Sequence, residues 1–414
     1  MNISVTNRNK CRLCEGKNLS KILSFESTPL FDEIVTSDKL GKDFSYPMNL
    51  YFCNICLSVQ SSHDLNISEY YKDYQYVASN SNFIKNYMQM LVDFTYKRFN
   101  FDANDNVIEV GAADGYLLSL FKKKGMKTLG FEGADNLCKL ASANEINVIN
   151  SLFDENSIHL IPDEFKKTQL FVLLHTFDHL YDPIPFLENV KKILDPKRGV
   201  FLIEVHDLND IYKKHETSLF GHEHATYLHF NSIERFLKRN GFKILEFNFL
   251  PKNLCRGSSM LVAASLEESE FKVANNLSNF EEPHLDKLQT FVDFEKSIKI
   301  SFKNLRDYIE KEKKLGRRFA GYGGWGRGVT TLSMVGLTAK HFEFIADSNP
   351  SLKGCYTPAT HIPIVEPERI KKEDVDEVIV FNYGYIDEIR NNLSKFLKSN
   401  GKIVSIIDYL KISN

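Results

Sequence analysis

The sequence lacks an excess of either charge: among 414 residues, 52 lysines and arginines stand against 54 aspartates and glutamates, a formal net charge of −2. A global basic field is therefore absent, and we expect no nucleic-acid partner. The sequence also lacks an apolar N-terminal segment and any run of about 18 apolar residues, which argues against a membrane partner. We expect a cytoplasmic protein, and in that reducing compartment its cysteines should not form disulfides.

Cysteine is scarce outside one region: four of the seven cysteines lie in the first 56 residues, as the pairs Cys11/Cys14 and Cys53/Cys56. Two C-x2-C pairs place four thiolates on turns that can close a tetrahedron around zinc. The 38 residues between the pairs exceed the usual zinc-ribbon spacing, so we expect a small subdomain to be inserted there. Four thiolates leave no position for water, and an apparent metal affinity of roughly 10–16 kcal/mol would hold together a module too small for its own core. The sequence therefore predicts a structural Zn²⁺ ion, with two chance cysteine pairs as the alternative.

Hydrophobic residues indicate an alternation of strands and helices from about residue 84 to 265. Residues 106–125 have the pattern of a buried strand, a glycine turn and an amphipathic helix, and further strands are expected within KTLGFEGA, 170–180 and 199–207. This spacing predicts a doubly wound, mostly parallel sheet.

The sequence thus predicts an α/β protein in four consecutive parts. The central Rossmann-like domain is followed by a charged, helical stretch, after which strand, glycine-rich turn and helix recur. We expect a zinc-binding module at 1–75, the first Rossmann-like domain at 76–265, a helical connector at 266–316 and a second Rossmann-like domain at 317–414.

The first glycine turn has the pattern E-x-G-x-x-x-G, made by Glu109, Gly111 and Gly115. A dinucleotide fingerprint needs a middle glycine so that backbone amides can approach a pyrophosphate, and Ala113 occupies that place here. S-adenosylmethionine contains no phosphate and tolerates the alanine better. Glu132 ends the next strand about 20 residues on, where an acid can bond ribose hydroxyls. An NAD site and a purely structural turn with a chance acid are the alternatives.

Histidine is concentrated: seven of the 12 lie between residues 175 and 229, three of them in the segment FGHEHATYLHF. With an unperturbed pKa of about 6.5, histidine suits proton transfer near neutral pH. If the segment is extended, His222 and His224 share one face and Glu223 points the other way. Two histidines at that spacing could also bind a metal ion or be purely structural. Spacing alone leaves these three alternatives open.

Taken in order, these motifs resemble those of the nucleotide-sugar C-methyltransferases of deoxysugar biosynthesis, over nearly the whole chain. DYQYVASNS is similar to the family's Y-x-Y-x-S segment, VIEVGAADGYLL to its E-I-G-x-N-D-G turn, HTFDHLYD to its N-V-x-A-H-V loop and GHEHATY to its Y-H-E-H-x-x-Y segment. GYGGWGRGVTTL and DSNPSLKGCYTPATHIPI resemble G-Y-G-A-A-A-K-G and D-x-N-P-x-K-x-G-x-Y-T-P-G-T-H-I-P-I. The resemblance implies a zinc module, a central class I methyltransferase domain that binds S-adenosylmethionine, and a C-terminal Rossmann-like domain.

The resemblance also implies methyl transfer to a sugar carbon beside a ketone, on a nucleotide-linked sugar. In that family the histidine that closes H-E-H is the base, which is His224 here. Removal of the C3 proton beside a 4-keto group gives an enolate, whose oxyanion His179 or a tyrosine would stabilise. The catalytic candidates are His224, Glu223, His179, Tyr76 and His222. The expected cofactor contacts are Glu109, Gly111, Ala113, Asp114, Gly115, Glu132 and His175, and the expected substrate contacts are Arg327, Gly324, Gly326, Tyr227 and Arg256.

Three positions near the expected acceptor depart from the family's motifs. Gly221 replaces the tyrosine before H-E-H, His175 replaces the asparagine of N-V-x-A-H, and CRGSSM, which contains Arg256, replaces H-G-G-S-L-R. The cofactor turn and the zinc pairs are kept, which favours a retained cofactor and a changed acceptor. Methylation of a sugar oxygen, with His224 again as the base, is therefore an alternative.

Two functions of other classes are also open. An NAD-binding oxidoreductase would hold its dinucleotide on the C-terminal glycine turn, and a non-catalytic, zinc-stabilised binding protein would have lost its chemistry. GYGGWGRG could hold the phosphates of a sugar nucleotide, with Arg327 supplying the charge, or be a tight structural turn. Asp347 ends the next strand, where a ribose-binding acid would lie. We expect a nucleotide-sugar substrate as the partner and favour a monomer.

Overall fold

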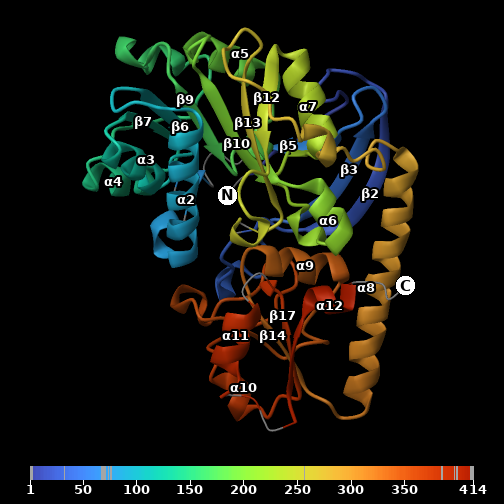
Figure 1. Ribbon diagram of the computed structural model, residues 1–414. Helices are drawn as coiled ribbons and strands as arrows, with labels where there is room; N and C mark the ends of the chain where they lie inside the picture. The colour runs from blue at the N-terminus through green and yellow to red at the C-terminus, as the bar shows by residue number, and fades with distance from the viewer. Residues whose placement is uncertain are drawn as a thin grey trace. The chain divides into compact units, whose positions relative to one another are not determined.

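The contacts between residues in the computed structural model (Figure 1) divide the chain into two units. This grouping cuts across the four consecutive parts expected from the sequence, because the segment between the cysteine pairs and the segment that ends in H-E-H both have most of their contacts with the C-terminal part. The first unit contains Met1–Leu19, Cys53–Leu208 and Ala225–Asp286, and the second contains Ser20–Phe52, Asn209–His224 and Lys287–Asn414.

Two of the residues predicted for the site, Tyr76 and Arg256, lie outside the residues that the structure describes. Within the described ranges, no helix is both long enough and apolar enough to cross a membrane. The described residues are 3–31, 33–66, 71, 72, 74, 77–255, 257–383, 386–395, 397 and 400–410.

The first unit is built on a sheet of strands in the order β12-β13-β10-β9-β6-β7-β8. The strands from β10 to β8 pair in parallel, and β13 is antiparallel to both β10 and β12. The predicted doubly wound, mostly parallel sheet is confirmed. Its strands are β6 (Asn106–Val110), β7 (Lys127–Glu132), β8 (Val148–Asn150), β9 (Leu170–Leu174), β10 (Val200–His206), β12 (Phe242–Phe247) and β13 (Ser259–Leu266).

Both faces of this sheet are buried, which explains the continuous apolar runs in its strands. Along β9, Phe171 and Leu173 join one hydrophobic cluster, and Val172 and Leu174 join another on the opposite face. Helices cover both faces of a parallel sheet for this reason. They are α2 (Asn82–Arg98), α3 (Tyr116–Lys123), α4 (Asp135–Ala143), α5 (Pro183–Ile193) and α7 (Phe230–Arg239), with 3-10 turns η2 (Ala78–Asn80), η3 (Ile158–Leu160), η4 (Asp163–Phe165), η5 (Phe177–His179), η7 (Lys252–Leu254) and η8 (Leu277–Phe280).

Small antiparallel pairs bring distant segments of the first unit together. β1 (Val5–Asn7) pairs with β5 (His63–Leu65), and β4 (Val59–Ser61) pairs with β11 (Thr226–Tyr227). The amide of Ala225, just before β11, donates to the carbonyl of Asp178 in η5 at 2.7 Å. The residues that follow the second cysteine pair are therefore joined both to the first strand of the chain and to β11.

A parallel sheet in the order β16-β15-β14-β17-β18 forms the core of the second unit. The strand order reverses between β14 and β17, as in a Rossmann unit, so the second Rossmann-like domain is confirmed. The long helix α8 (Leu288–Lys314) precedes it (Figure 1). The strands of this sheet are β14 (Phe319–Tyr322), β15 (Ile345–Ala346), β16 (Ile364–Val365), β17 (Glu377–Val380) and β18 (Lys402–Ser405), whereas β2 (Leu19–Thr28) and β3 (Tyr46–Cys53) lie outside it. The other helices and 3-10 turns are α6 (Leu208–Lys214), α9 (Arg327–Val335), α10 (Arg369–Lys372), α11 (Ile386–Leu393), α12 (Ile406–Leu410), η1 (Ser37–Lys39), η6 (Thr217–Leu219) and η9 (Pro350–Leu352).

Strands β12 and β13 have no counterpart among the strands expected from the sequence. β13 is a short apolar run with its first seven residues buried, and such a run cannot be assigned to strand or helix by periodicity alone. The connector expected at 266–316 forms its long helix, α8, only from Leu288. Residues up to Asp286 instead make most of their contacts within the first unit.

Candidate active site and zinc centre

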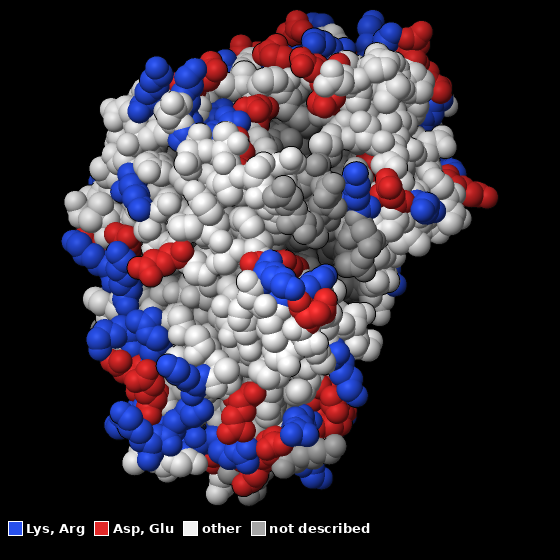
Figure 2. All heavy atoms as spheres, turned by 180° about the vertical axis from the view of Figure 1, so that it is seen from behind, with Lys and Arg blue, Asp and Glu red and all other residues white. Residues whose placement is uncertain are grey.

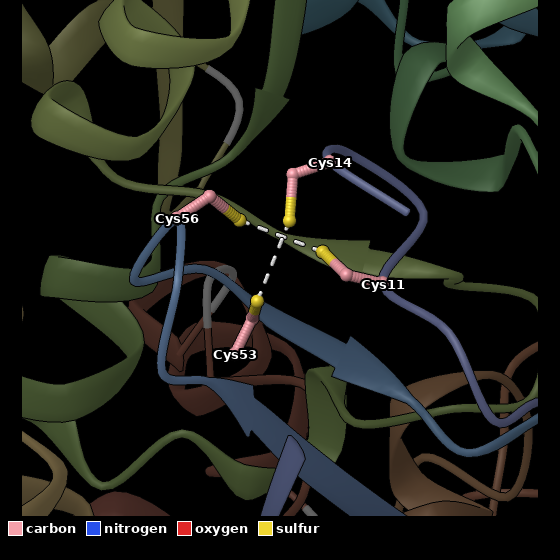
Figure 3. Close-up of side chains that lie close together, drawn as sticks. All are labelled: Cys11, Cys14, Cys53 and Cys56. Carbon is pink, nitrogen blue, oxygen red and sulfur yellow. Dashed lines mark hydrogen bonds between the residues drawn. The ribbon is translucent and has the colours of Figure 1, made fainter. Parts of the chain in front are cut away.

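Four sulfur atoms converge in the first unit, one from each cysteine of the two pairs (Figure 3). Cys11 Sγ lies 3.5 Å from Cys56 Sγ, and Cys14 Sγ lies 3.6 Å from Cys53 Sγ. All four sulfurs lie within 4.8 Å of one another. A tetrahedron with zinc–sulfur bonds of about 2.3 Å has edges close to these lengths, so the four residues fit zinc. The neighbouring Cys53 sulfur raises the pKa of Cys11 to about 11, so full ionisation of the set calls for a cation.

The two cysteine pairs lie on turns of the same geometry. The amide of Glu15 donates to the Cys11 carbonyl at 2.9 Å, and the amide of Leu57 donates to the Cys53 carbonyl at 2.8 Å. Glu15 and Leu57 each follow the second cysteine of their pair and have positive φ angles of 57° and 61°. Three of the four cysteines are buried in the hydrophobic cluster that includes the central sheet. The predicted zinc site is therefore part of the core of the first unit.

Arg12, between the first two cysteines, is a buried cation. Its guanidinium donates to Asp64 Oδ1 at 2.6 Å, to the Ser61 hydroxyl at 3.0 Å and to the His63 carbonyl at 2.9 Å. It also donates to the Tyr181 carbonyl at 3.2 Å and lies over the Tyr181 ring. Burial lowers the pKa of Arg12, and the Asp64 carboxylate opposes that change. The turn of the first cysteine pair is thereby tied to the loop that follows β9.

The glycine turn predicted to hold the cofactor follows β6, where the strand order reverses between β6 and β9. Gly111 has a φ of 75°, and a Cβ atom at this position would overlap the Thr176 hydroxyl, so only glycine fits. Ala113 also has a positive φ, of 47°. The turn ends at Gly115, the N-cap of α3. Ligands of doubly wound sheets bind at this kind of position.

Two carboxylates border the turn. Glu132, at the end of β7, accepts hydrogen bonds from the amides of Ala113 at 2.8 Å and Ala134 at 2.9 Å. Burial raises the pKa of Glu132, and these amides oppose the rise. Asp114 is 2% exposed and accepts from the Ser79 amide at 3.2 Å, while its Oδ1 has no partner among the described residues. A buried carboxylate oxygen that lacks a partner among the described residues suits a ligand with a hydrogen-bond donor or a positive charge, and S-adenosylmethionine has both.

The last two cofactor candidates lie on β6 and just after β9. Glu109 is buried within β6. His175 has a φ of 51°, a left-handed conformation uncommon outside glycine. Its amide donates to the Glu204 carbonyl at 2.8 Å, and its Nε2 lies 3.2 Å from Glu204 Oε1, without hydrogen-bond geometry. The structure thus brings all seven expected cofactor residues to the ends of β6, β7 and β9.

Among the described acid–base candidates, His179 is the member of the first unit. It ends η5, and its Nδ1 lies 3.2 Å from the Tyr71 hydroxyl. Tyr71 was not singled out from the sequence, although the segment YYKDYQY contains four tyrosines. The sequence offered no means of telling which of them reaches the histidine.

The H-E-H segment lies in the second unit and forms a turn. The amide of His224 donates to the Gly221 carbonyl at 3.1 Å, and the extended strand begins only at Thr226. The condition under which His222 and His224 would share one face, an extended segment, is therefore not met, because this local hydrogen bond bends the chain.

The two histidine rings of this turn bond to different carbonyls. His222 Nε2 lies 2.8 Å from the Thr28 carbonyl oxygen, and His224 Nδ1 lies 2.7 Å from that of Leu219. Because a carbonyl only accepts, each of these nitrogens carries the hydrogen. The neutral His224 ring therefore has its lone pair on Nε2. These separate partners favour separate roles for the two rings rather than one shared metal ion.

Phe31, from the segment between the cysteine pairs, packs against the turn. A Cβ atom on Gly221 would overlap the Phe31 ring. The Phe31 amide donates to Glu223 Oε1 at 2.8 Å, and its ring centroid lies 5.3 Å from that of His224. The missing tyrosine side chain at position 221 is thus matched by a phenylalanine that fills the adjoining space.

The C-terminal glycine turn also has internal partners. The Gly324 amide donates to Asp347 Oδ2 at 2.9 Å, and the Gly326 amide donates at 2.9 Å to a main-chain carbonyl of the segment between the cysteine pairs. Arg327 pairs with the buried Glu216 at 2.9 Å. A phosphate at the predicted contacts would therefore have to replace groups of the protein.

Asp347 is the counterpart of Glu132. Each acid ends or follows the second strand of its sheet, and each accepts a hydrogen bond from an amide of the preceding glycine turn. The C-terminal turn also has the spacing G-x-G-x-x-G, through Gly321, Gly323 and Gly326. That spacing was a signal in the sequence for a nucleoside-type site in the second unit.

The remaining substrate candidate, Tyr227, lies in β11 and is 1% exposed. Lysines and arginines are interspersed with aspartates and glutamates on the face of the molecule that Figure 2 shows. This mixed pattern agrees with the formal net charge of −2.

Three family models match the chain in consecutive order. Their descriptions are "Putative zinc binding domain" for residues 11–71, "Methyltransferase domain" for 83–246 and "C-methyltransferase C-terminal domain" for 255–407. The three together account for both cysteine pairs, the first glycine turn and the second Rossmann-like unit.

One characterised relative is similar over almost the full length. C-methyltransferase NovU from Streptomyces niveus is 25% identical over 400 residues, which cover 95% of this chain and 94% of that protein. Among solved structures, PH0226 protein from Pyrococcus horikoshii has a TM-score of 0.38 at 14% identity, covering 48% of this chain and 99% of that one. An S-adenosylmethionine-dependent methyltransferase from Archaeoglobus fulgidus has a TM-score of 0.34 at 17% identity, covering 42% and 93%.

Proposed function

We propose that the chain, an S-adenosylmethionine-dependent methyltransferase with the three domains of a C-methyltransferase, methylates a sugar carried on a nucleotide. The observation that carries the proposal is a pair of glycine turns, one in each Rossmann-like unit. An amide of each turn donates a hydrogen bond to an acid at or just after the end of the next strand, Glu132 in the first unit and Asp347 in the second, and we call these acid-closed turns. One turn suits the nucleoside of the cofactor and the other suits the nucleoside of a second ligand. An acceptor that itself contains a nucleotide would use the second of these sites.

The first turn would hold the cofactor through the chain's own polar groups. Glu132 can accept hydrogen bonds from ribose hydroxyls while keeping its two amide donors, because each carboxylate oxygen accepts more than one hydrogen bond. Asp114 offers its remaining oxygen to a donor or a cationic group. The bound cofactor supplies an electrophilic methyl group on a sulfonium, and the protein positions the acceptor and excludes water.

His224 is the proposed base. Its Nδ1 hydrogen is committed to the Leu219 carbonyl, so the neutral ring presents a lone pair on Nε2, the atom that would take a proton from the sugar. Glu223 stabilises the turn by accepting the Phe31 amide, which makes it a positioning residue. His222, held by the Thr28 carbonyl, supports the same turn.

His179 is the proposed donor to the oxygen that gains charge when the sugar carbon is deprotonated. The Tyr71 hydroxyl at 3.2 Å from Nδ1 can orient its ring. Tyr76, in the same tyrosine-rich segment, keeps the role that the family resemblance implies. Together these residues would take a proton from a carbon next to a ketone and stabilise the resulting enolate.

The second unit would hold the nucleotide of the acceptor. Asp347 is placed as a ribose-binding acid, and Gly324, Gly326 and Arg327 remain the proposed phosphate contacts. Arg327 would then exchange Glu216 for a phosphate, a change that replaces one anionic partner with another. Tyr227 and Arg256 remain proposed contacts to the sugar.

Methylation of oxygen is the second candidate, favoured by one observation. Phe31 fills the space beside Gly221, so an apolar ring is present where the family's motif has a phenol. An acceptor that needs no hydrogen bond from that phenol would suit this arrangement better, and a hydroxyl group needs only a base such as His224.

The experiment is methyl transfer from labelled S-adenosylmethionine to a panel of nucleotide sugars, half with a 4-keto group and half fully hydroxylated. Transfer to the keto sugars, with the new methyl on carbon by NMR, supports the proposal. A methyl on oxygen selects the second candidate. Absence of transfer to the whole panel, with S-adenosylmethionine bound, would exclude both.

A further inference from the structure

A second histidine–carboxylate pair lies at the carboxyl edge of the first sheet. His206 is the last residue of β10, and its Nδ1 lies 2.7 Å from Asp178 Oδ2 in η5. The His206 side chain is 11% exposed and the Asp178 side chain 2%. Neither residue was singled out from the sequence, because they are 28 positions apart and only the parallel packing of β9 and β10 brings them together.

The contact fixes which nitrogen of His206 carries the hydrogen in the neutral ring. A carboxylate accepts, so Nδ1 carries the hydrogen and the Nε2 atom gains or loses the second proton. The buried carboxylate also stabilises the imidazolium form once the ring is protonated. Catalytic histidines oriented by an aspartate use the same arrangement.

The pair is next to the predicted cofactor site. The His206 ring centroid lies 4.8 Å from that of His175, which precedes the Thr176 that contacts the Gly111 turn. An oxygen of Asp178 and a ring nitrogen of His179 lie within 4.8 Å of each other. Ligands of doubly wound sheets bind outside the carboxyl ends of the strands, which is the edge where His206 stands.

The main chain of Asp178 is also held in place. Its carbonyl accepts from the amide of Ala225 at 2.7 Å. In addition, the motif N-V-x-A-H-V has alanine where this chain has Asp178. The carboxylate is therefore a departure from the motif at a position next to His179.

We propose that His206 is a second acid–base residue of the methyl-transfer site, with Asp178 as its positioning residue. The proposal rests on the proposed function, in which His224 removes the sugar proton. His206, as the imidazolium, gives its Nε2 proton to the carbonyl oxygen of the acceptor while the carbon-bound proton passes to His224. The product of this step is a neutral enol rather than a bare enolate.

In the methyl-transfer step that follows, His206 takes back the proton that it gave to the acceptor oxygen. The enol carbon forms a bond to the methyl group as the sulfur–methyl bond breaks, and that electron pair stays on sulfur. The enol oxygen returns its proton to His206 Nε2 as the carbonyl re-forms. The proton on His224 then leaves to solvent, so each turnover replaces one carbon-bound hydrogen with a methyl group.

Among the described residues, the structure places several charged and titratable groups near His206. They are Asp178 from η5, His175 from the loop after β9 and Glu204 from β10 itself, and the paired strand β13 presents Ser259, whose hydroxyl donates to Glu204 Oε1 at 2.9 Å. Two carboxylates thus stand near two imidazoles.

The test compares His206→Gln, Asp178→Asn and Asp178→Glu with the matched control His159→Gln, an exposed histidine in η3. His206→Gln should lower kcat at least about 100-fold, with affinity for S-adenosylmethionine within a few-fold of the wild type. Asp178→Asn should move the alkaline limb of the kcat profile to lower pH, because the imidazolium loses its stabilising charge. Asp178→Glu should restore part of the wild-type profile, and His159→Gln should match the wild type.

Two failures are distinguishable. If the wild-type enzyme transfers methyl groups and His206→Gln has unchanged kcat and an unchanged pH profile, this proposal is overturned and the proposed function stands. If the wild-type enzyme binds S-adenosylmethionine but transfers to no member of the sugar panel, the proposed function is overturned and the role of His206 with it. Because His206→Gln can fail to fold, Asp178→Asn, which keeps the side-chain volume, provides the pH profile independently.

Discussion

The guanidinium of Arg12 donates to the main-chain carbonyl of Tyr181 at 3.2 Å, a contact that spans 169 positions of sequence. Arg12 stands between Cys11 and Cys14, and Tyr181 follows His179 by two residues. The turn of the zinc site and the loop of a proposed catalytic residue are therefore held by one side chain. A substitution that disrupts the zinc site should therefore also change the conformation of the loop that contains His179.

Replacing Arg12 with methionine should destabilise the protein by at least about 3 kcal/mol, because a buried charged partner of Asp64 is removed and several acceptors lose their donor. Urea denaturation measures the loss. The matched control is Arg8→Met, since Arg8 also binds Asp64 but keeps 21% of its side chain exposed, and it should cost about 1 kcal/mol or less. Equal costs for the two variants would contradict the assignment of Arg12 as the anchor.

The zinc site predicts about one zinc ion per chain, lost together with the folded state of the first unit when a cysteine ligand is removed. Cys53→Ser should bind no zinc and unfold at lower temperature, as measured by metal analysis and circular dichroism. Cys138→Ser, a buried cysteine in α4, is the control and should retain its zinc. A Cys53→Ser protein that keeps its zinc and its melting temperature would argue against a four-thiolate site.

The proposed base predicts that His224→Ala abolishes methyl transfer while cofactor affinity stays within a few-fold. The reason is that alanine removes the Nε2 lone pair, whereas the residues of the first glycine turn stay unchanged. Turnover with labelled S-adenosylmethionine and a binding titration measure the two effects. The exposed His159→Ala serves as the control. Normal turnover by His224→Ala would remove this residue from the mechanism.

The two acid-closed turns predict a clean separation of ligands. Glu132→Gln should weaken S-adenosylmethionine about 10- to 100-fold, because an amide offers one acceptor and directs an NH2 group at amide donors. Asp347→Asn should weaken the nucleotide sugar by a similar factor and leave S-adenosylmethionine unchanged. Calorimetric titration of both variants with both ligands measures the four affinities, and each variant is the control for the other. Weaker binding of the same ligand in both variants would contradict the assignment of one ligand to each turn.

Gly221 predicts a steric conflict that a double-mutant cycle can isolate. Gly221→Ala should cost about 1–3 kcal/mol, because its new methyl group overlaps the Phe31 ring. In the background of Phe31→Ala the same change should cost far less. Urea denaturation of the four proteins gives the coupling energy. Additive costs would show that the ring does not set the choice of glycine.

The parts of the candidate site that are formed by residues close together in the sequence could be predicted from it. The cysteine pairs and the turn at Gly111 depend on neighbours within a few residues, so their spacing was enough. The contact between Phe31 and Glu223 spans 192 positions and that between Asp178 and His206 spans 28, and both depend on which strands and segments pack together. Periodicity carries no information on such pairings. The turn at His224 depends on a single local hydrogen bond to Gly221, which a segment that otherwise suits a strand does not reveal.

The 38 residues between Cys14 and Cys53 begin and end at the same metal site. Strands β2 and β3 of this segment hold buried side chains such as Met48 and Leu50, but the turns between them can change in length at small thermodynamic cost, since closure entropy grows only slowly with length. Phe31 belongs to the same segment and reaches the H-E-H turn. Substitutions in this segment between the cysteine pairs could therefore change acceptor specificity during evolution, while the sheet that holds the cofactor stays unchanged.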